Sequence, residues 1–228
     1  MTPSLPPRYG ESRSLLERLQ ARVVPILEPN QTILDVGAGR LPTIPPAQRP
    51  TGICYVGLDI AAEELSGAPD GAYDEVYVGD ITQFDGRLAE RFEVATSCHV
   101  LEHVRSVPAA LENLRRYLRP DGRLMMLFAS TFSAHAIANR VLPEAWGARL
   151  LDRPSDSKFP AVYDNCWPAA VRSAMTEWSY VEIVPLFLGA HYFARWPLLQ
   201  QVFLHHENWA QLRHWEHLTS HMLLLARR

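Results

Sequence analysis

The chain has 228 residues, of which 47% are apolar and 21% charged, which suffices for one domain with a sizeable core. Its formal net charge of -3 argues against the basic surface that is typical of nucleic-acid-binding proteins. Three widely spaced cysteines without a CxxC pair argue against a disulfide framework or a thiolate zinc site, and they indicate a reducing compartment.

The N-terminal region lacks the apolar segment of a signal peptide, and no apolar run approaches the roughly 20 residues that cross a bilayer. We therefore expect a cytoplasmic protein with no membrane span. Residues 1–30 are predicted to form a proline-containing arm and an amphipathic helix over Glu11–Leu27, which bends or ends near Pro25.

Segments typical of strands and of helices alternate in the first half of the chain. The predicted strands are Thr32–Val36, Ile53–Leu58, Glu75–Val78, Phe92–Ser97 and Arg123–Phe128. The predicted helices are Ala61–Leu65, Gly86–Arg91 and Val107–Leu118, with a turn at Arg119–Gly122. Prolines between Gly39 and Ile53 exclude a long helix after the first strand. This alternation predicts an α/β fold with a mostly parallel, doubly wound sheet.

The second half of the chain has a less regular pattern. In order, we predict a loop at Ser130–Pro168, a helix at Ala169–Trp178, a strand at Ser179–Pro185, an aromatic-rich and partly helical stretch at Gly189–Trp215, and a strand at His221–Arg227. The aromatic-rich stretch is therefore expected to be an insertion between the two final strands, and not a separate domain.

Small or acidic residues, two of them followed by an isoleucine, lie at or just beyond the ends of four predicted strands. They are Asp35, Gly37 and Gly39 after the first strand, Asp59 and Ile60 after the second, Asp80 and Ile81 after the third, and Ser97 at the end of the fourth. Ligands of open α/β sheets bind beyond the carboxyl ends of the strands, so we expect these residues to lie together. Glycines let the backbone approach a ligand, and an acid about 20 residues later is placed to bind ribose hydroxyls.

The sequence favours a nucleoside with a cationic group over a dinucleotide. A dinucleotide-binding loop has a third glycine where this chain has Pro42. A pyrophosphate also needs a helix N-terminus, which the proline-rich stretch does not provide, and Asp35 adds negative charge.

Five stretches in register carry a resemblance to a known family. They are ILDVGAGR, YVGLDI, VYVGDITQF, FEVATSCHVLEHV and LRPDGRLMM, and they span about Thr32 to Phe128. Together they resemble class I S-adenosylmethionine-dependent methyltransferases, particularly the group with LEHV after the fourth strand. The departure is Arg40-Leu41-Pro42, where many members have another glycine, and Arg40 has no assigned role.

The resemblance implies a Rossmann-like, seven-stranded sheet whose last strand is antiparallel. From the length and pattern of the chain we expect one domain over 1–228, with a cofactor-binding half at 31–130 and a substrate-side half at 131–228. The resemblance further implies that Asp35, Gly37 and Gly39 approach the methionine part of S-adenosylmethionine. Asp59 is then expected at the ribose, and Asp80 with Ile81 at the adenine.

Two histidines are candidate general bases, His99 after the fourth strand and His135 after the fifth. On a helix, His99, Glu102 and His103 would share one face, which is a possible metal triad. The alternative is that Glu102 and His103 support the cofactor site, and we assign no metal. Cys98 is expected to be a buried packing residue.

The acceptor is expected to be a small molecule or a glycan, methylated at oxygen. Tyr163, Asp164 and Asn165 could hydrogen-bond it, and Trp196 could stack on a ring. The histidines and tryptophans near the C-terminus either pack a helix on the sheet or on a second subunit, as in a homodimer, or form a lid. Alternatives are N-methylation, a catalytically silent cofactor-binding subunit and an NAD-dependent dehydrogenase.

Overall fold

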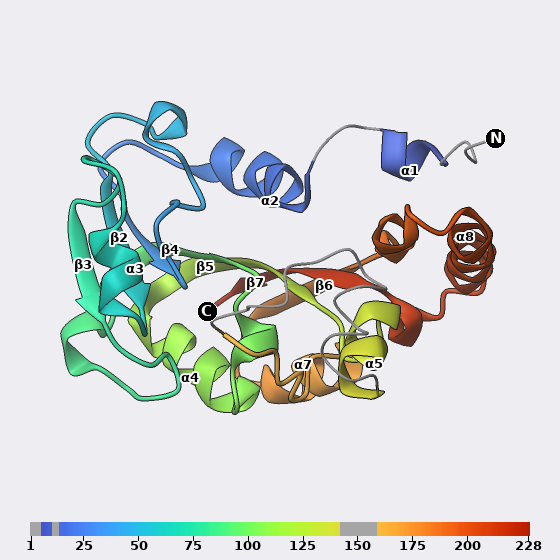
Figure 1. Ribbon diagram of the computed structural model, residues 1–228. Coiled ribbons are helices and arrows are strands. Elements are labelled where there is room, and N and C mark those ends of the chain that lie inside the picture. The colour runs from blue at the N-terminus through green and yellow to red at the C-terminus, as the bar shows by residue number, and fades with distance from the viewer. Residues whose placement is uncertain (1–5, 11–13, 142–158) are drawn as a thin grey trace.

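The computed structural model describes residues 6–10, 14–141 and 159–228. Seven strands form one sheet in the order β3-β2-β1-β4-β5-β7-β6 (Figure 1). They are β1 (Thr32–Val36), β2 (Cys54–Asp59), β3 (Glu75–Val78), β4 (Phe92–Cys98), β5 (Leu118–Ala129), β6 (Tyr180–Leu186) and β7 (His221–Arg227). The pairs from β3 to β5 are parallel, and β7 runs antiparallel to both β5 and β6. The predicted Rossmann-like sheet is thus confirmed.

Helices cover both faces of the sheet (Figure 1). The α-helices of the described residues are α1 (Pro7–Gly10), α2 (Leu15–Val23), α3 (Ala62–Ser66), α4 (Val107–Tyr117), α5 (Ala134–Val141), α7 (Pro168–Ala174) and α8 (Pro197–Leu212). Helix α2 packs Leu19 and Val23 on one face, and α4 and α7 pack on the other. None of the helices in the described ranges is long and apolar enough to cross a membrane.

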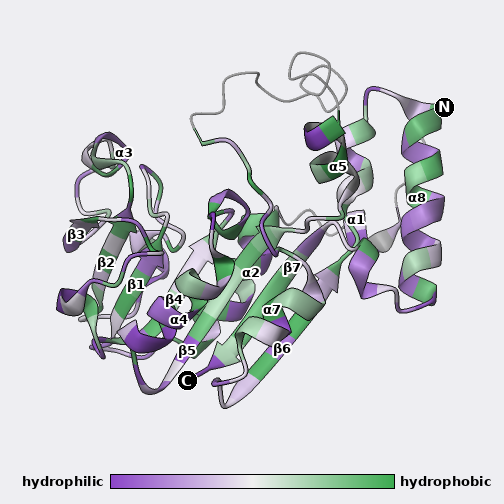
Figure 2. Ribbon diagram, turned by 90° about the horizontal axis from the view of Figure 1, so that it is seen from below, coloured by the Kyte–Doolittle hydropathy of each residue, from purple (hydrophilic) through white to green (hydrophobic). Residues whose placement is uncertain are grey.

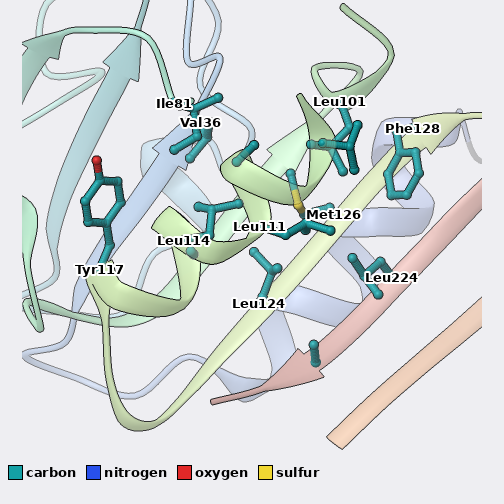
Figure 3. Close-up of a cluster of buried hydrophobic side chains, with 14 of the residues drawn as sticks. Val36, Ile81, Leu101, Leu111, Leu114, Tyr117, Leu124, Met126, Phe128 and Leu224 are labelled. Carbon is teal, nitrogen blue, oxygen red and sulfur yellow. The ribbon is translucent and has the colours of Figure 1, made fainter. Parts of the chain in front are cut away.

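Successive side chains of β5 point to opposite faces of the sheet, so they belong to two different hydrophobic clusters, one on each face. Met125 belongs to the cluster under α2, whereas Met126 lies with Leu111 and Leu114 of α4. Figure 3 shows Leu111, Leu114 and Met126 in this second cluster. Because both faces of the central strands are buried, the sheet holds its strand ends in fixed positions, and these ends carry the site described below.

The N-terminal helix follows the sequence signals at both of its ends. Ser14 and Glu17 form a reciprocal capping box at the start of α2. Pro25 lies in a 3-10 turn, Val24–Ile26, which follows the helix directly. The predicted change near Pro25 is confirmed, and the described helix begins at Leu15.

Several predicted boundaries are wrong. The predicted loop Ser130–Pro168 contains α5, and its residues 142–158 lie outside the described residues. The helix predicted at Ala169–Trp178 ends at Ala174, and that at Gly86–Arg91 is a 3-10 turn, Gly86–Leu88.

The predicted turn Arg119–Gly122 lies inside β5 instead. The register of β5 on β4 shifts there from Phe92↔Leu118 to Val94↔Arg123, so the extra residues bulge out of the ladder.

The insertion between β6 and β7 is confirmed. It holds a 3-10 helix, Gly189–Phe193, then α8, and it returns so that Leu186 pairs with His221. Figure 2 shows α8 at one end of the molecule, beside α5 and beyond the sheet.

Candidate functional site

A cavity of about 760 Å³ lies beyond the carboxyl ends of β1, β2, β3 and β4. Its lining includes most of the residues that the sequence predicted for the site, namely Gly37, Gly39, Asp59, Ile60, Asp80, Ile81 and His99. The structure therefore brings together side chains from four separate strand ends.

The glycine loop after β1 needs its glycines for two different reasons. Gly37 has φ +66°, and a Cβ there would lie 2.1 Å from Cγ2 of Val100, so no larger residue fits. Gly39 has φ +53°, but a Cβ there would meet no atom closer than 3.9 Å. The space beside Gly39 is open, and its backbone can be approached from the cavity.

Asp59 connects the glycine loop to the segment after β2. Its Oδ2 accepts a hydrogen bond of 3.0 Å from the backbone N–H of Gly39, and its Oδ1 accepts one of 2.9 Å from Ala61. Each carboxylate oxygen has a second lone pair, so Asp59 can hold the loop and also accept bonds from hydroxyl groups.

The part of the cavity lining that follows β3 combines one exposed acid with an apolar side chain. Asp80 is exposed, and its Oδ1 accepts a 2.8 Å bond from the Thr82 N–H. Ile81 is buried, and the Asn113 side chain of α4 donates a 2.8 Å bond to its carbonyl. Ile60, which follows β2, is 59% exposed and also lines the cavity. A flat apolar ring with a polar edge is a suitable ligand for such a surface.

Asp35 lies behind the glycine loop and is not part of the cavity lining. It is fully buried, and it accepts bonds of 2.7 Å from both the N–H and the hydroxyl of Thr43 and of 2.8 Å from the Tyr55 hydroxyl. Burial raises the pKa of Asp35 to about 6, although the bonds from Thr43 and Tyr55 oppose that rise. Asp35 therefore supports the loop after β1. Its expected position next to the methionine part of S-adenosylmethionine remains a prediction.

Two residues that sequence reasoning missed fix the same loop. The Tyr73 hydroxyl donates a 2.6 Å bond to the Ala38 carbonyl. Arg40, which had no assigned role, forms a 2.9 Å ion pair with Glu64 of α3, and Glu64 lines the cavity. No local sequence motif predicts these contacts, because each of them joins residues more than twenty positions apart in the sequence.

His99 and Glu102 form a pair at the edge of the cavity. His99 Nδ1 lies 2.8 Å from Oε1 of Glu102, whose side chain is 5% exposed, whereas the His99 side chain is 39% exposed and lines the cavity. Within the described residues, Oε2 of Glu102 has no hydrogen-bond partner. The role of Glu102 as the buried partner of the His99 ring was missed, since sequence alone placed Glu102 either in a possible metal triad or as a support of the cofactor site.

The segment from His99 to His103 is not an α-helix, so the helical condition for the possible metal triad is not met, although His99 and Glu102 still contact each other. His99 has φ +60°, and Leu101–His103 forms a 3-10 turn. Among the described residues, no group of three or more His, Cys, Asp or Glu side chains could hold a metal ion.

Two further site predictions have a different outcome. Ser97 is buried and lies outside the cavity lining, where Cys98 takes its place. Burial raises the pKa of the Cys98 thiol to about 12, which argues against a thiolate nucleophile. His135 lies in α5, and its side chain is outside the described part of the structure, so its role stays a prediction.

One part of the substrate-side half contributes to the lining of the cavity. Phe159, Pro160 and Val162 belong to the lining, and the N–H groups of Val162 and Tyr163 both donate 2.8 Å bonds to the Glu102 carbonyl. Tyr163, with Asp164 and Asn165, lines a second hollow of about 600 Å³ that shares Arg105 and Val162 with the first. Trp196 is 49% exposed and lines neither hollow.

The fold and the cavity agree with a comparison to known families. The family described as "Methyltransferase domain" matches residues 9–182. The chain belongs to this methyltransferase family. The membership and the sheet together confirm the class I S-adenosylmethionine-dependent methyltransferase that the sequence motifs indicated. The cavity lies beyond the carboxyl ends of the strands, where open α/β sheets bind their ligands.

Individual methyltransferases resemble this one over different lengths. The ubiquinone biosynthesis O-methyltransferase of Haemophilus ducreyi is 31% identical over 110 residues, which are 44% of this chain and 45% of that protein. The match thus spans less than half of that relative.

Solved structures agree in fold over most of this methyltransferase. Phosphoethanolamine N-methyltransferase 2 of Haemonchus contortus, in complex with S-adenosyl-L-methionine, has a TM-score of 0.58 at 12% identity, covering 93% of this chain and 52% of that one. Geranyl diphosphate C-methyltransferase of Streptomyces coelicolor A3(2) has a TM-score of 0.56 at 15% identity, covering 93% and 74%. Since these neighbours methylate different atoms, their likeness establishes the fold and not the acceptor.

Proposed function

We propose that this methyltransferase acts on a hydroxyl group of a small-molecule or glycan acceptor. The observation that carries the proposal is the His99–Glu102 pair, which places an imidazole at the cavity and a buried carboxylate behind it. The part-length relative that is named an O-methyltransferase supports the same choice of atom.

The cavity residues fit S-adenosylmethionine. The open space beside Gly39 admits a ligand against the backbone, and Asp59 offers lone pairs for ribose hydroxyls. Asp80 and the apolar surface of Ile81 suit the amino edge and the ring of an adenine. The loop after β1 leads to no α-helix before β2, so the site lacks the helix N-terminus that a pyrophosphate prefers.

When bound, S-adenosylmethionine supplies a methyl group on a cationic sulfur that is already a good leaving group. The protein's own contribution is then to align the acceptor, exclude water and remove a proton. Phe159, Pro160 and Val162 contribute apolar surface to the lining, beside which an acceptor can be held with little water. Fixed alignment of two reactants lowers a barrier by roughly several kcal/mol.

The imidazole of His99 is the group proposed to take the hydroxyl proton. With a proton on Nδ1, it donates to Glu102 Oε1, and this fixes the tautomer in which Nε2 can accept. The buried carboxylate stabilises the imidazolium that results. An amine acceptor that is already deprotonated would need this base less, so the pair favours a hydroxyl.

Calorimetric titration tests the proposal in its first stage. The purified protein is titrated with S-adenosylmethionine, S-adenosylhomocysteine and NAD, each with and without a chelator. We expect binding of both adenosyl ligands, no binding of NAD and no effect of the chelator. Failure to bind either adenosyl ligand would favour a catalytically silent subunit and contradict the proposed activity.

The second stage identifies the acceptor atom. Phenols, catechols and sugars are compared with matched amines, using S-adenosylmethionine that carries a labelled methyl group. We expect label on oxygen, with loss of turnover in the His99→Ala variant while S-adenosylhomocysteine binding is retained. Transfer to amines at a rate that His99→Ala leaves unchanged would contradict O-methylation by this base.

A further inference from the structure

The outward face of α8 carries a regular stripe of exposed side chains. Leu198, Val202, Trp209 and Leu212 are 86%, 64%, 45% and 80% exposed, and His205 lies between them. We call these five residues the α8 stripe. The residues follow one another at intervals of four, three, four and three positions. This average of 3.5 residues is typical of a helix that packs lengthwise against a second helix.

The inward face of α8 is fixed, so the stripe cannot turn into the protein. Gln200, Leu204, Glu207 and Ala210 are buried on the side opposite the stripe. The Glu207 carboxylate accepts a 2.5 Å bond from the Gly189 N–H, and the Tyr9 hydroxyl of α1 also donates to it. Because this acid is held from two sides, the orientation of α8 is set by buried contacts.

The stripe also lacks the charges that keep a solvent-facing helix soluble. Glu207 is the only Asp, Glu, Lys or Arg residue in the α8 sequence PLLQQVFLHHENWAQL, and it lies on the inward face. An exposed helix normally carries charged residues on its outer face. Depletion of charge around large apolar side chains is instead typical of the core of a protein–protein interface.

Apolar surface continues from the stripe into a groove between α8 and α5. This groove of about 430 Å³ is lined by Val202 and Phe203 of α8, and by Phe132 and Ile137, which are 42% and 48% exposed. On the other flank, Arg8 anchors α1 through a 2.5 Å bond to Asn208. The helix α1 thus fixes one side of α8, and no helix or strand of the described residues covers the stripe.

We propose that the α8 stripe is the interface with a second copy of this chain, with the two α8 helices packed antiparallel about a two-fold axis. A two-fold interface must be self-complementary. The stripe meets this condition because it is apolar at both ends and has His205 near its middle, so that apolar ends face apolar ends. A lipid surface fits less well, since α8 itself contains no Lys or Arg to meet anionic headgroups.

The neighbouring groove belongs to the same interface. A pair of short helices covers less than the roughly 800 Å² per partner of a standard interface. Phe132 and Ile137 at the groove supply further apolar area next to Val202. This inference rests on α8 and does not depend on the proposed acceptor or base.

Sedimentation velocity over a range of protein concentrations tests the proposal. The full chain is expected at twice its mass of 25.8 kDa. The double variant Leu198→Glu/Leu212→Glu should raise the dimer dissociation constant at least about a hundredfold, since four buried charges would replace apolar contacts. The matched control is Leu41→Glu, because Leu41 is 79% exposed and lies far from α8 in the sequence. Far-UV circular dichroism and thermal melting verify that each variant is folded.

A crosslinking measurement keeps the test independent of these variants. His205→Cys should give a covalent dimer with a short bismaleimide, whereas Leu41→Cys should not. A wild-type chain that stays monomeric at every concentration would overturn the proposal. A monomer that pellets with phosphatidylcholine or phosphatidylserine vesicles, and loses this binding in the double variant, would also overturn it in favour of a lipid partner.

Discussion

The Asp59 carboxylate at the end of β2 accepts a 3.0 Å hydrogen bond from the backbone N–H of Gly39, twenty residues earlier in the chain. The acid that faces the cavity therefore also holds the loop that forms the neighbouring wall. Through its other oxygen it fixes Ala61 at the entry to α3. One side chain thus couples the shape of the site to its capacity to bind hydroxyl groups.

Replacing Asp59 by Ala should weaken both the ligand site and the fold. We expect the affinity for S-adenosylhomocysteine to fall at least about tenfold. The free energy of unfolding should fall by about 3 kcal/mol or more, because two hydrogen bonds to a charged acceptor are lost and each contributes roughly 1.5–3 kcal/mol. Calorimetry and urea unfolding measure the two effects. Asp80→Ala is the control for stability, since it removes an exposed cavity acid that does not hold the loop, although its affinity for the ligand should also fall. Unchanged ligand affinity in Asp59→Ala would refute the ribose role.

The two loop glycines should respond differently to the same substitution. Gly37→Ala combines a left-handed backbone with a clash on Val100, and should lower the free energy of unfolding by about 2–4 kcal/mol. Gly39→Ala has room for its methyl group and should cost about 1 kcal/mol. It should nevertheless reduce adenosyl-ligand binding, because the methyl group occupies the open space beside the loop. Equal losses of stability in both variants would contradict this assignment.

Asp35 should make stability depend on pH in the opposite sense from an ordinary ion-paired acid. Its pKa rises from 3.8 to about 6 in the folded state, so between these values the folded chain binds more protons than the unfolded chain. Its contribution to stability is therefore fully present below the lower value and is lost as the pH rises through the window.

Comparison with Asp35→Asn isolates this contribution, since the amide does not titrate. The free energy of unfolding of the wild type minus that of Asp35→Asn should decrease by up to about 3 kcal/mol from about pH 4 to about pH 7. Guanidinium unfolding at four pH values measures both proteins. Parallel pH profiles for the two would show that burial does not shift Asp35 in this way.

The His99–Glu102 pair predicts a graded loss of turnover. His99→Ala should lower kcat by about 100-fold to 10,000-fold, the range of a general base, with little change in S-adenosylhomocysteine affinity. Glu102→Gln keeps the shape of the site and should lower kcat less, because it removes the charge that stabilises the imidazolium. The measurement is kcat and KM as a function of pH once an acceptor is found. A Glu102→Gln variant with the pH profile of the wild type would remove Glu102 from this role.

The parallel part of the fold could be predicted because its signals are local. Thr32–Val36 and Glu75–Val78 have the predicted bounds, and both are short apolar or alternating runs bounded by turn residues. The strand-end residues followed from these strands, since parallel strands carry their carboxyl ends to one edge. Helix α5 also had a local signal that was overlooked: the Ser133 hydroxyl accepts a bond from the Ala136 N–H, as an N-cap does.

The parts that sequence reasoning missed depend on contacts between distant residues. HVLEH has helical spacing, but His99 takes a positive φ while its N–H bonds to Leu127 of the neighbouring strand, and so the helix cannot form. The burial of Glu102 and the bond from Tyr73 to the glycine loop likewise arise from tertiary packing. A local sequence pattern cannot predict contacts between residues that lie far apart in the sequence.

The pairing of Leu186 with His221 has a consequence for how such enzymes diversify. The insertion leaves and re-enters the sheet at adjacent points, so a short hairpin could close the same gap and leave the sheet intact. We therefore expect that residues 187–220 can be replaced as one unit without loss of the sheet. The Tyr9–Glu207 contact sets the condition for such a replacement, since α1 must be transplanted with the unit that it holds.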